Sequence, residues 1–187
     1  LTLEPNTVFH HRPPVLPDPD VIADIEDAGR VLLAGAGLRR YEVSAFARPG
    51  YHCRHNLNYW RFGDYLGIGP GAHGKRTLAD GRVIRRTKQR GPDAYLAAMP
   101  GRGALSREWS LSRDDRVIEY CLNALRLVHG VPVAEFSTRT GLSLRVLADA
   151  RGNAVALGLL ADDVSRIRPT DLGLRYLNDL LALFARS

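Results

Sequence analysis

The sequence predicts an α/β fold, more broadly an α+β fold, in which a strand–helix–strand unit precedes a helical domain. Two observations carry this prediction. Residues 1–46 alternate between strand-like and helix-like hydrophobic patterns, whereas residues 106–187 carry three helical patterns, a short strand pair and a closing helix. The 187 residues are enough to bury a core without disulfides.

The first predicted domain, residues 1–48, holds the strand–helix–strand unit. Leu1–Leu3 is expected to end a strand, and five prolines between positions 5 and 19 predict an extended loop. Asp18 and Pro19 suit an N-cap and a first helical residue, and apolar residues at helical spacing follow. Alternation from Tyr41 to Ala45 predicts the second strand. Such a crossover favours parallel pairing, so we expect the last repeat of a larger barrel or doubly wound sheet, preceded by more chain.

The second predicted domain, residues 49–105, connects the other two. Residues 49–74 are rich in glycine with interspersed aromatic residues, which predicts irregular structure. The segment 75–87 contains Asp80 and Gly81, a pair typical of a two-residue turn in a β-hairpin.

The third predicted domain, residues 106–187, has the element order of a winged-helix domain. Ser112 and Asp115 have the spacing of a capping box at the start of a helix. A short second helix, a third helix capped by Ser143, a small β wing and a last helix capped by Thr170 are predicted to follow.

Composition limits the function classes. Hydrophobic residues make up 45% and charged residues 25%, as in globular domains, and no segment approaches the ~18 apolar residues of a membrane helix. Cys53 and Cys121 predict neither a disulfide framework nor a zinc site, which favours the reducing cytoplasm. The net charge of +6 permits an acidic partner such as nucleic acid, a lipid surface or a tetrapyrrole with propionates, and equally permits a role in solubility alone.

The stretch CRHNLNYW is the most unusual in the chain. Its His55 offers an imidazole, the usual axial ligand of haem iron in globins and peroxidases. Tyr59 and Trp60 have rings that stack on a porphyrin, and Arg54 suits propionates because a guanidinium binds carboxylates with two parallel hydrogen bonds. The structural alternative is that His55 and Asn56 hydrogen-bond a loop, while the two aromatic rings pack it against the core.

A glycine-rich stretch at residues 65–74 is a second candidate. Its four glycines would let backbone approach a ligand closely. The spacing differs from the dinucleotide fingerprint and from the P-loop, so a tight loop is the alternative. Basic residues between positions 82 and 90 suit phosphates or carboxylates, or form a solvated face.

No catalytic or metal constellation is recognisable. The six histidines have no HxxxH or HExxH spacing, and no CxxxCxxC run is present for an iron–sulfur cluster. We therefore expect no metal site and no self-sufficient catalytic site in these residues.

Six stretches follow one another in a recognisable order: residues 1–7, 41–50, 53–60, 64–73, 111–116 and 169–173. In this order they resemble the HemW family, radical-SAM relatives of the oxygen-independent coproporphyrinogen III dehydrogenases (also called oxidases). The resemblance covers nearly the whole chain. Its most specific part is the HNxxYW motif, residues 55–60, because the dehydrogenases carry a different sequence there.

The resemblance implies an architecture. Residues 1–48 would close a radical-SAM partial TIM-type barrel, and residues 106–187 would be the HemN-type C-terminal domain. In full-length members a CxxxCxxC motif binds a [4Fe–4S] cluster that cleaves S-adenosylmethionine, so this chain alone is expected to have no radical activity. Thr2 and His73 fall where the dehydrogenases approach S-adenosylmethionine, although those enzymes usually carry an apolar residue at the position of His73.

The resemblance also implies a function. HemW proteins are regarded as haem chaperones that bind haem and pass it to respiratory haem proteins, with membrane association through those partners. His55 would then be the axial ligand, with Arg54, Asn56, Tyr59 and Trp60 around the haem.

Two other functions stay open. The chain could be part of a coproporphyrinogen III dehydrogenase, which the HNxxYW motif argues against. A winged-helix nucleic-acid binder would read duplex with residues 143–157, but Arg145 and Arg151 beside Asp149 offer little positive charge to phosphates, so we expect no nucleic acid. Apolar residues between 21 and 46 would be uncovered without a barrel, which predicts a dimer or other self-association.

Overall fold

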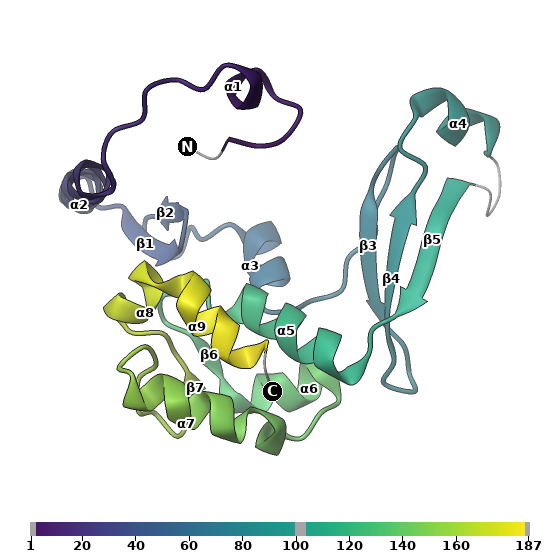
Figure 1. The fold of residues 1–187 in the computed structure, drawn as a ribbon. Coiled ribbons are helices and arrows are strands. Elements are labelled where there is room, and N and C mark those ends of the chain that lie inside the picture. Colours follow the sequence, from purple (N-terminus) through teal and green to yellow (C-terminus); the bar gives the residue numbers. More distant parts are fainter. Residues whose placement is uncertain (1–2, 100–103, 186–187) are drawn as a thin grey trace. The chain divides into compact units, whose positions relative to one another are not determined.

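A computed structural model describes residues 3–99 and 104–185 (Figure 1). The chain divides into two compact units, residues 1–39 and residues 40–187. No helix in the described ranges is long and apolar enough to cross a membrane.

The first unit contains a short helix, α1 (Val8–His11), and a long helix, α2 (Pro19–Gly35). As predicted, α2 begins directly after Asp18 and is followed by Gly37 in the left-handed region, at φ +77°. No residue of α2 is buried. The strand expected at Leu1–Leu3 falls mostly outside the described residues, so the parallel strand–helix–strand unit stays a prediction.

The single strand predicted from Tyr41 to Ala45 is wrong, because the chain turns in its middle. It forms two strands, β1 (Arg39–Glu42) and β2 (Ala45–Ala47), which pair with each other. Side chains close the turn between them. The Arg40 guanidinium donates hydrogen bonds to two carbonyls of the turn at 2.8 and 3.3 Å, and the Glu42 carboxylate accepts one from an amide of the turn at 2.9 Å.

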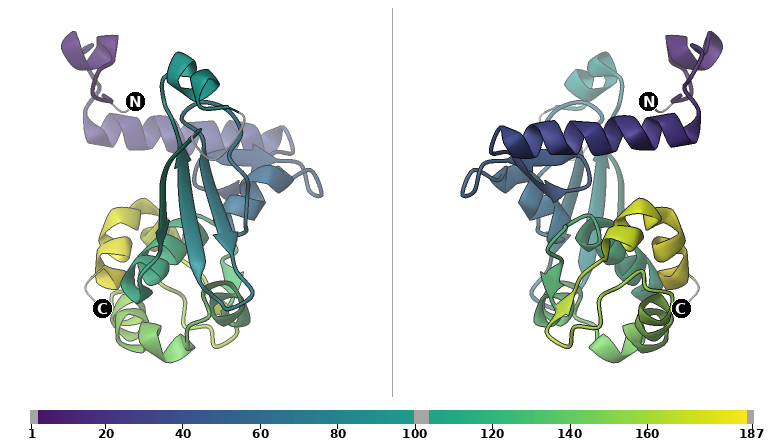
Figure 2. Two further views of the ribbon diagram at one scale, coloured as in Figure 1. Left: turned by 90° about the vertical axis from the view of Figure 1, so that its right-hand side faces the viewer. Right: turned by 90° about the vertical axis from the view of Figure 1, so that its left-hand side faces the viewer.

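A three-stranded antiparallel sheet stands beside the helices of the second unit, as Figures 1 and 2 show. It consists of β3 (His73–Thr77), β4 (Val83–Lys88) and β5 (Leu105–Ser110), and α4 (Pro92–Ala97) lies between β4 and β5 in the chain. The sequence did not predict β5. This strand crosses the domain boundary expected after residue 105, and the domain limits remain predictions.

The hairpin predicted around Asp80 and Gly81 is present, but its loop has three residues rather than two. Leu78 donates its amide to the carbonyl of Arg82 at 2.8 Å, which closes the loop. Gly81 donates to the carbonyl of Leu78 at 2.9 Å and has φ +81°. A turn followed by a left-handed glycine is the usual geometry of a three-residue hairpin loop.

The helical part confirms the predicted capping box. Ser112 Oγ accepts a hydrogen bond from the amide of Asp115 at 3.1 Å, and the Asp115 carboxylate accepts one from the amide of Ser112 at 3.2 Å. The elements that follow are α5 (Arg113–Ala124), β6 (Val131–Pro132), α6 (Val133–Thr140), a 3₁₀ helix η2 (Leu144–Leu147), α7 (Ala148–Ala156), β7 (Arg166–Ile167), α8 (Asp171–Arg175) and α9 (Leu177–Phe184).

Two predicted helices each prove to be two elements. The helix after Ser143 starts as η2 and continues as α7, and the last predicted helix divides at Tyr176 into α8 and α9. The wing is small: Leu160 bridges Pro169, and β7 pairs with β6. These are differences of local regularity, and the mixed α+β class is as predicted.

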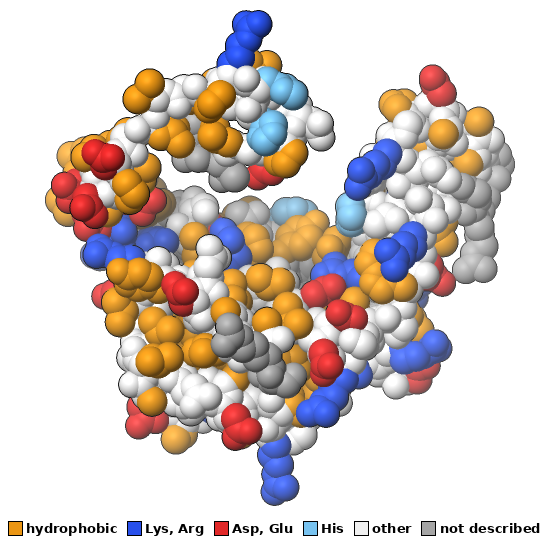
Figure 3. All heavy atoms as spheres, viewed as in Figure 1, with side chains coloured by type: hydrophobic (Ala, Val, Ile, Leu, Met, Phe, Trp, Pro, Cys, Tyr) orange, Lys and Arg blue, Asp and Glu red, His pale blue; other side chains and the backbone are white. Residues whose placement is uncertain are grey.

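One hydrophobic core joins the helices to the sheet. Buried residues of α5, α6, α7 and α9 pack with Val83 of β4 and with Phe62 in the segment before β3. Figure 3 shows that hydrophobic side chains also lie on the outside of the helical part. The shared core fixes the sheet against the helices and thereby positions the candidate site between them.

Candidate functional site

The HNxxYW motif forms a short helix, α3 (Arg54–Trp60), where the sequence predicted irregular structure. That prediction is wrong because it rested on the glycines that follow, and α3 itself contains no glycine or proline. Leu57 and Trp60, three positions apart, pack against the hydrophobic core. Arg54 and His55, in the first turn of the helix, are exposed.

His55 is held in a row of aromatic rings. Its ring centroid lies 4.7 Å from that of Tyr59 at an interplanar angle of 76°, an edge-to-face contact. Tyr59 in turn contacts Tyr65, with centroids 4.4 Å apart. The hydroxyl of Tyr65 accepts a hydrogen bond from Arg85 Nη1 at 2.6 Å, and Arg85 forms an ion pair with Glu119. The imidazole is therefore exposed, yet its orientation is linked to the sheet and to α5.

Trp60 lies on the opposite side of α3 from His55. Arg126 stacks over its ring, with the guanidinium carbon 4.3 Å from the ring centroid, and also pairs with the buried Glu42 at 3.1 Å. Trp60 Nε1 is buried and has no hydrogen-bond partner among the described residues. The ring thus packs α3 against the core, which is the structural alternative for this residue. Its contact with haem stays a prediction.

Arg61 ties the end of α3 to the helical part. Its guanidinium donates to both carboxylate oxygens of Glu135 in α6, with Nε 3.2 Å from Oε2. Arg54, at the other end of α3, forms no ion pair within the described residues and is exposed. Asn56 is half-buried. The predicted roles of Arg54 and Asn56 beside a haem therefore stay predictions.

A buried lysine holds the segment after α3 against the sheet. Lys75 Nζ lies 2.9 Å from Asp64 Oδ1, 2.9 Å from the carbonyl oxygen of Phe62 and 4.0 Å from the centre of the Phe62 ring. Burial is the largest influence on the pKa of Lys75 and lowers it, against the opposing effect of Asp64. Burial also opposes ionisation of Asp64, but hydrogen bonds from Lys75 and Thr77 outweigh it and lower the pKa of Asp64.

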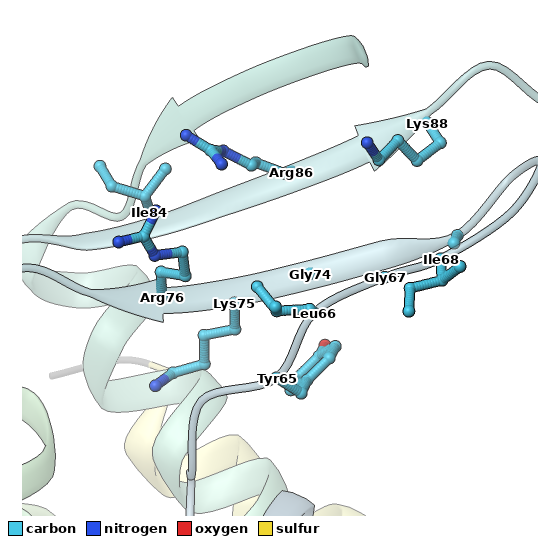
Figure 4. A pocket seen from close by; sticks show the side chains of 11 residues that line it. Tyr65, Leu66, Gly67, Ile68, Gly74, Lys75, Arg76, Ile84, Arg86 and Lys88 are labelled. Atoms are coloured by element: carbon cyan, nitrogen blue, oxygen red, sulfur yellow. The ribbon is translucent and has the colours of Figure 1, made fainter. Parts of the chain in front are cut away.

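The glycine-rich stretch pairs with the sheet edge. Tyr65 bridges Lys75, with each amide donating to the other residue's carbonyl. A Cβ at Gly67 would lie 2.2 Å from the carbonyl oxygen of His73, so only glycine allows this approach. A pocket of about 230 Å³ opens over this segment and one face of β3 and β4 (Figure 4). His73 is exposed at the start of β3, and Thr2 lies outside the described residues, so contact of either with S-adenosylmethionine stays a prediction.

The predicted nucleic-acid reading helix offers less charge than its sequence suggests. Arg151 in α7 donates hydrogen bonds to the carbonyls of Asp163 and Arg166 and so holds the wing. Between residues 3 and 99 and between 104 and 185, no group of three or more His, Cys, Asp or Glu side chains could hold a metal ion.

Comparisons with known proteins agree with this architecture. Residues 111–176 match the model of the HemN C-terminal domain. The chain is 47% identical over 184 residues to the heme chaperone HemW of Escherichia coli (strain K12), covering 98% of this chain and 48% of that protein. It is 44% identical to the heme chaperone HemW of Haemophilus influenzae, and this match covers 98% of this chain and 47% of that protein. The chain thus spans about half the length of the curated relatives it matches.

A solved structure shares the fold. It is described as "Coproporphyrinogen III oxidase (HemN) from Escherichia coli is a Radical SAM enzyme". The superposition covers 91% of this chain and 42% of the solved chain, with a TM-score of 0.63 and 20% sequence identity. At that identity the likeness concerns the fold alone. The sequence matches are high and continuous, and they include the α3 motif. The chain therefore corresponds to a C-terminal portion of the HemW proteins that it matches.

Proposed function

We propose that this chain binds haem, with His55 as an axial ligand to the iron, and contributes to passing the haem to haem proteins. The observation that carries the proposal is the placement of His55 on the exposed side of α3, with its ring fixed edge-on against Tyr59. A neutral imidazole with a defined orientation is a suitable iron ligand. The names of the curated relatives, heme chaperones, support the same reading.

The residues around His55 suit a haem that is bound and then passed on. Tyr59 and Tyr65 offer apolar ring surface beside the imidazole, and Arg54 offers a cation to a propionate. Other elements of the proposal rest on family membership: a [4Fe–4S] cluster and S-adenosylmethionine in the full-length protein, haem-accepting respiratory proteins as partners, and a cytoplasmic location. Within this chain, the residues bind and orient haem, and none is assigned a chemical step.

A haemin titration of the chain, followed by its Soret band, tests the proposal. We expect a saturable shift at one equivalent. His55→Ala should abolish it, because the iron loses its nitrogen ligand. His129→Ala is the matched control, since His129 is also exposed, and it should bind haemin like the unmodified chain.

Two results would count against haem binding by His55. An identical Soret response in the unmodified chain and His55→Ala would remove His55 as the ligand. Oxidation of coproporphyrinogen III by the full-length parent protein would instead support the dehydrogenase alternative.

A further inference from the structure

A second pocket lies on the sheet, and its walls are basic. It has a volume of about 440 Å³ and is lined by His73, Lys88, Arg90 and Arg107, together with small and neutral residues and no acidic side chain. Arg90 and Arg107 are exposed, and neither forms an ion pair with any described residue. Lys88, Arg90 and Arg107 line one pocket that has no carboxylate in its lining, and such a site favours an anionic ligand.

One of these cations is held in place. The guanidinium carbon of Arg107 lies 4.6 Å from the ring centroid of Trp109, two residues further along β5 on the same face. A planar guanidinium resting on an indole keeps its outer N–H groups directed to solvent and loses little conformational freedom when it binds a carboxylate. The sheet thus presents at least one pre-oriented guanidinium to the pocket.

The register of the sheet places this pocket on the same face as the aromatic row of His55. His73 is opposite Thr87, which is opposite Arg107, so the three side chains share one face. The next row on that face contains Lys75 and Arg85, two residues away along each strand.

Arg85 connects the two features. It hydrogen-bonds the Tyr65 hydroxyl, and Tyr65 contacts Tyr59, which contacts His55. A chain of contacts therefore runs from the imidazole of His55 through two tyrosine rings to Arg85, which lies two residues along β4 from Thr87 in the lining of the basic pocket. The smaller pocket in Figure 4 is lined by Gly74 and Arg86 from the opposite face of β3 and β4, and also by Tyr65 and Lys75. The two pockets share Lys88.

We propose that the basic pocket is a carboxylate-binding site, and that it receives a propionate of the haem bound at His55, an assignment that rests on the function proposed above. The apolar macrocycle lies along the tyrosine rings, and the carboxylate pairs with Arg90 and Arg107. Lys88, where the pairing of β4 with β5 shifts register, adds a third positive charge. His73 lines the same pocket.

Haemin and haemin dimethyl ester separate the two proposals, because the ester keeps the iron and macrocycle but has no carboxylates. The unmodified chain should bind haemin about tenfold more tightly than the ester, as expected for one charge-assisted pair. The double variant Arg90→Gln/Arg107→Gln should lose most of this preference, and what remains is due to Lys88 and to Arg54 beside His55. The matched control, Arg113→Gln/Arg145→Gln, removes the same charge at two other exposed positions and should keep the preference.

The possible outcomes are distinguishable. Equal binding of haemin and ester by the unmodified chain, with both abolished by His55→Ala, overturns the pocket and leaves the haem function standing. Binding of neither ligand overturns both. S-adenosylmethionine also carries a carboxylate and could occupy the pocket. If it displaces haemin from the unmodified chain but not from the double variant, the pocket binds S-adenosylmethionine and the propionate assignment is overturned. Circular dichroism should show that all variants keep their folded spectrum.

Discussion

At the scale of single residues, Gly67 illustrates how closely the segment after α3 lies against β3. A methyl group there would meet the carbonyl oxygen of His73 at 2.2 Å, and backbone atoms cannot yield as a flexible side chain can. Gly67→Ala should therefore lower the free energy of unfolding by about 1–3 kcal/mol, measured by urea denaturation.

Gly152 offers the matched control. It lies inside α7, and a Cβ there would have nothing within 4 Å. Gly152→Ala should raise the free energy of unfolding by roughly 0.5–1 kcal/mol because alanine favours the helix. If Gly67→Ala were as stable as the unmodified chain, the close approach of Gly67 to His73 would be contradicted.

Asp64 predicts a dependence of stability on pH. Its pKa in the folded chain lies below the ordinary value of 3.8, although burial opposes ionisation, because Lys75 and Thr77 donate hydrogen bonds to it. The resulting stabilisation is complete above the unfolded pKa and is lost as the pH falls through the folded pKa. Asp64→Asn should thus lower the melting temperature at pH 7, and the difference from the unmodified chain should shrink as the pH falls below 3.8.

Replacing an exposed carboxylate by glutamine is the control for the general effect of removing one negative charge. Glu26→Gln changes a residue for which Arg30 provides only a surface ion pair at 3.6 Å. It should shift the melting temperature little at either pH. A constant difference between Asp64→Asn and the unmodified chain across the pH range would rule out the carboxylate as its cause.

Some site residues could be predicted from the sequence, and others could not. The motif identified His55, Tyr59 and Trp60, but no pattern indicates that Tyr65 and Arg85 complete the aromatic row, since these contacts span from 6 to 20 positions in the sequence. Trp60 resembled a ligand-stacking residue, yet its ring packs under Arg126.

At the scale of elements, the capping box of α5 is the clearest agreement between sequence and structure. Ser112→Ala should lower the free energy of unfolding by about 1 kcal/mol, because the amide of Asp115 would lose its partner at the helix start. Ser110→Ala, at an exposed position of β5, is the control and should change stability by less than about 0.5 kcal/mol. Equal effects of the two substitutions would show that the cap contributes nothing.

Elements with local signals were predictable, and those that depend on distant partners were not. The proline at the start of α2, the capping box of α5 and the left-handed Gly141 after α6 each act within a few residues. The Asp18 side chain, predicted as the N-cap of α2, makes no capping hydrogen bond. The strand β5 was missed because its pairing partner β4 lies about 20 residues earlier, and its residues alternate only weakly between apolar and polar. The helix α3 was missed because its stability comes from Leu57 and Trp60 packing on a core that the sequence does not display.

At the scale of the whole molecule, the apolar residues of α2 predict association between chains. Ile25 is 60% exposed and Leu32 is 75% exposed, and α2 buries none of its residues. Apolar surface of this kind is usually covered by a partner. We expect light scattering to give a mass above that of one 20.6 kDa chain, rising with concentration.

Charged residues in place of the exposed apolar residues of α2 should reverse this association. Ile25→Glu/Leu32→Glu should return the mass toward that of a single chain, because burying the new carboxylates would be costly. A clean monomer at all concentrations in the unmodified chain would contradict the prediction.

The two ends of helix α3 are held by different kinds of contact. Its C-terminal end is fixed by Trp60 in the core and by the Arg61–Glu135 ion pair, whereas Cys53 at its N-terminal end provides no side-chain cap. His55 lies in the first turn of α3, where the first amides of a helix have no intrahelical acceptor. Because Tyr59 holds the exposed imidazole edge-on, a ligand can meet the ring from the solvent side without any rearrangement of the core behind α3.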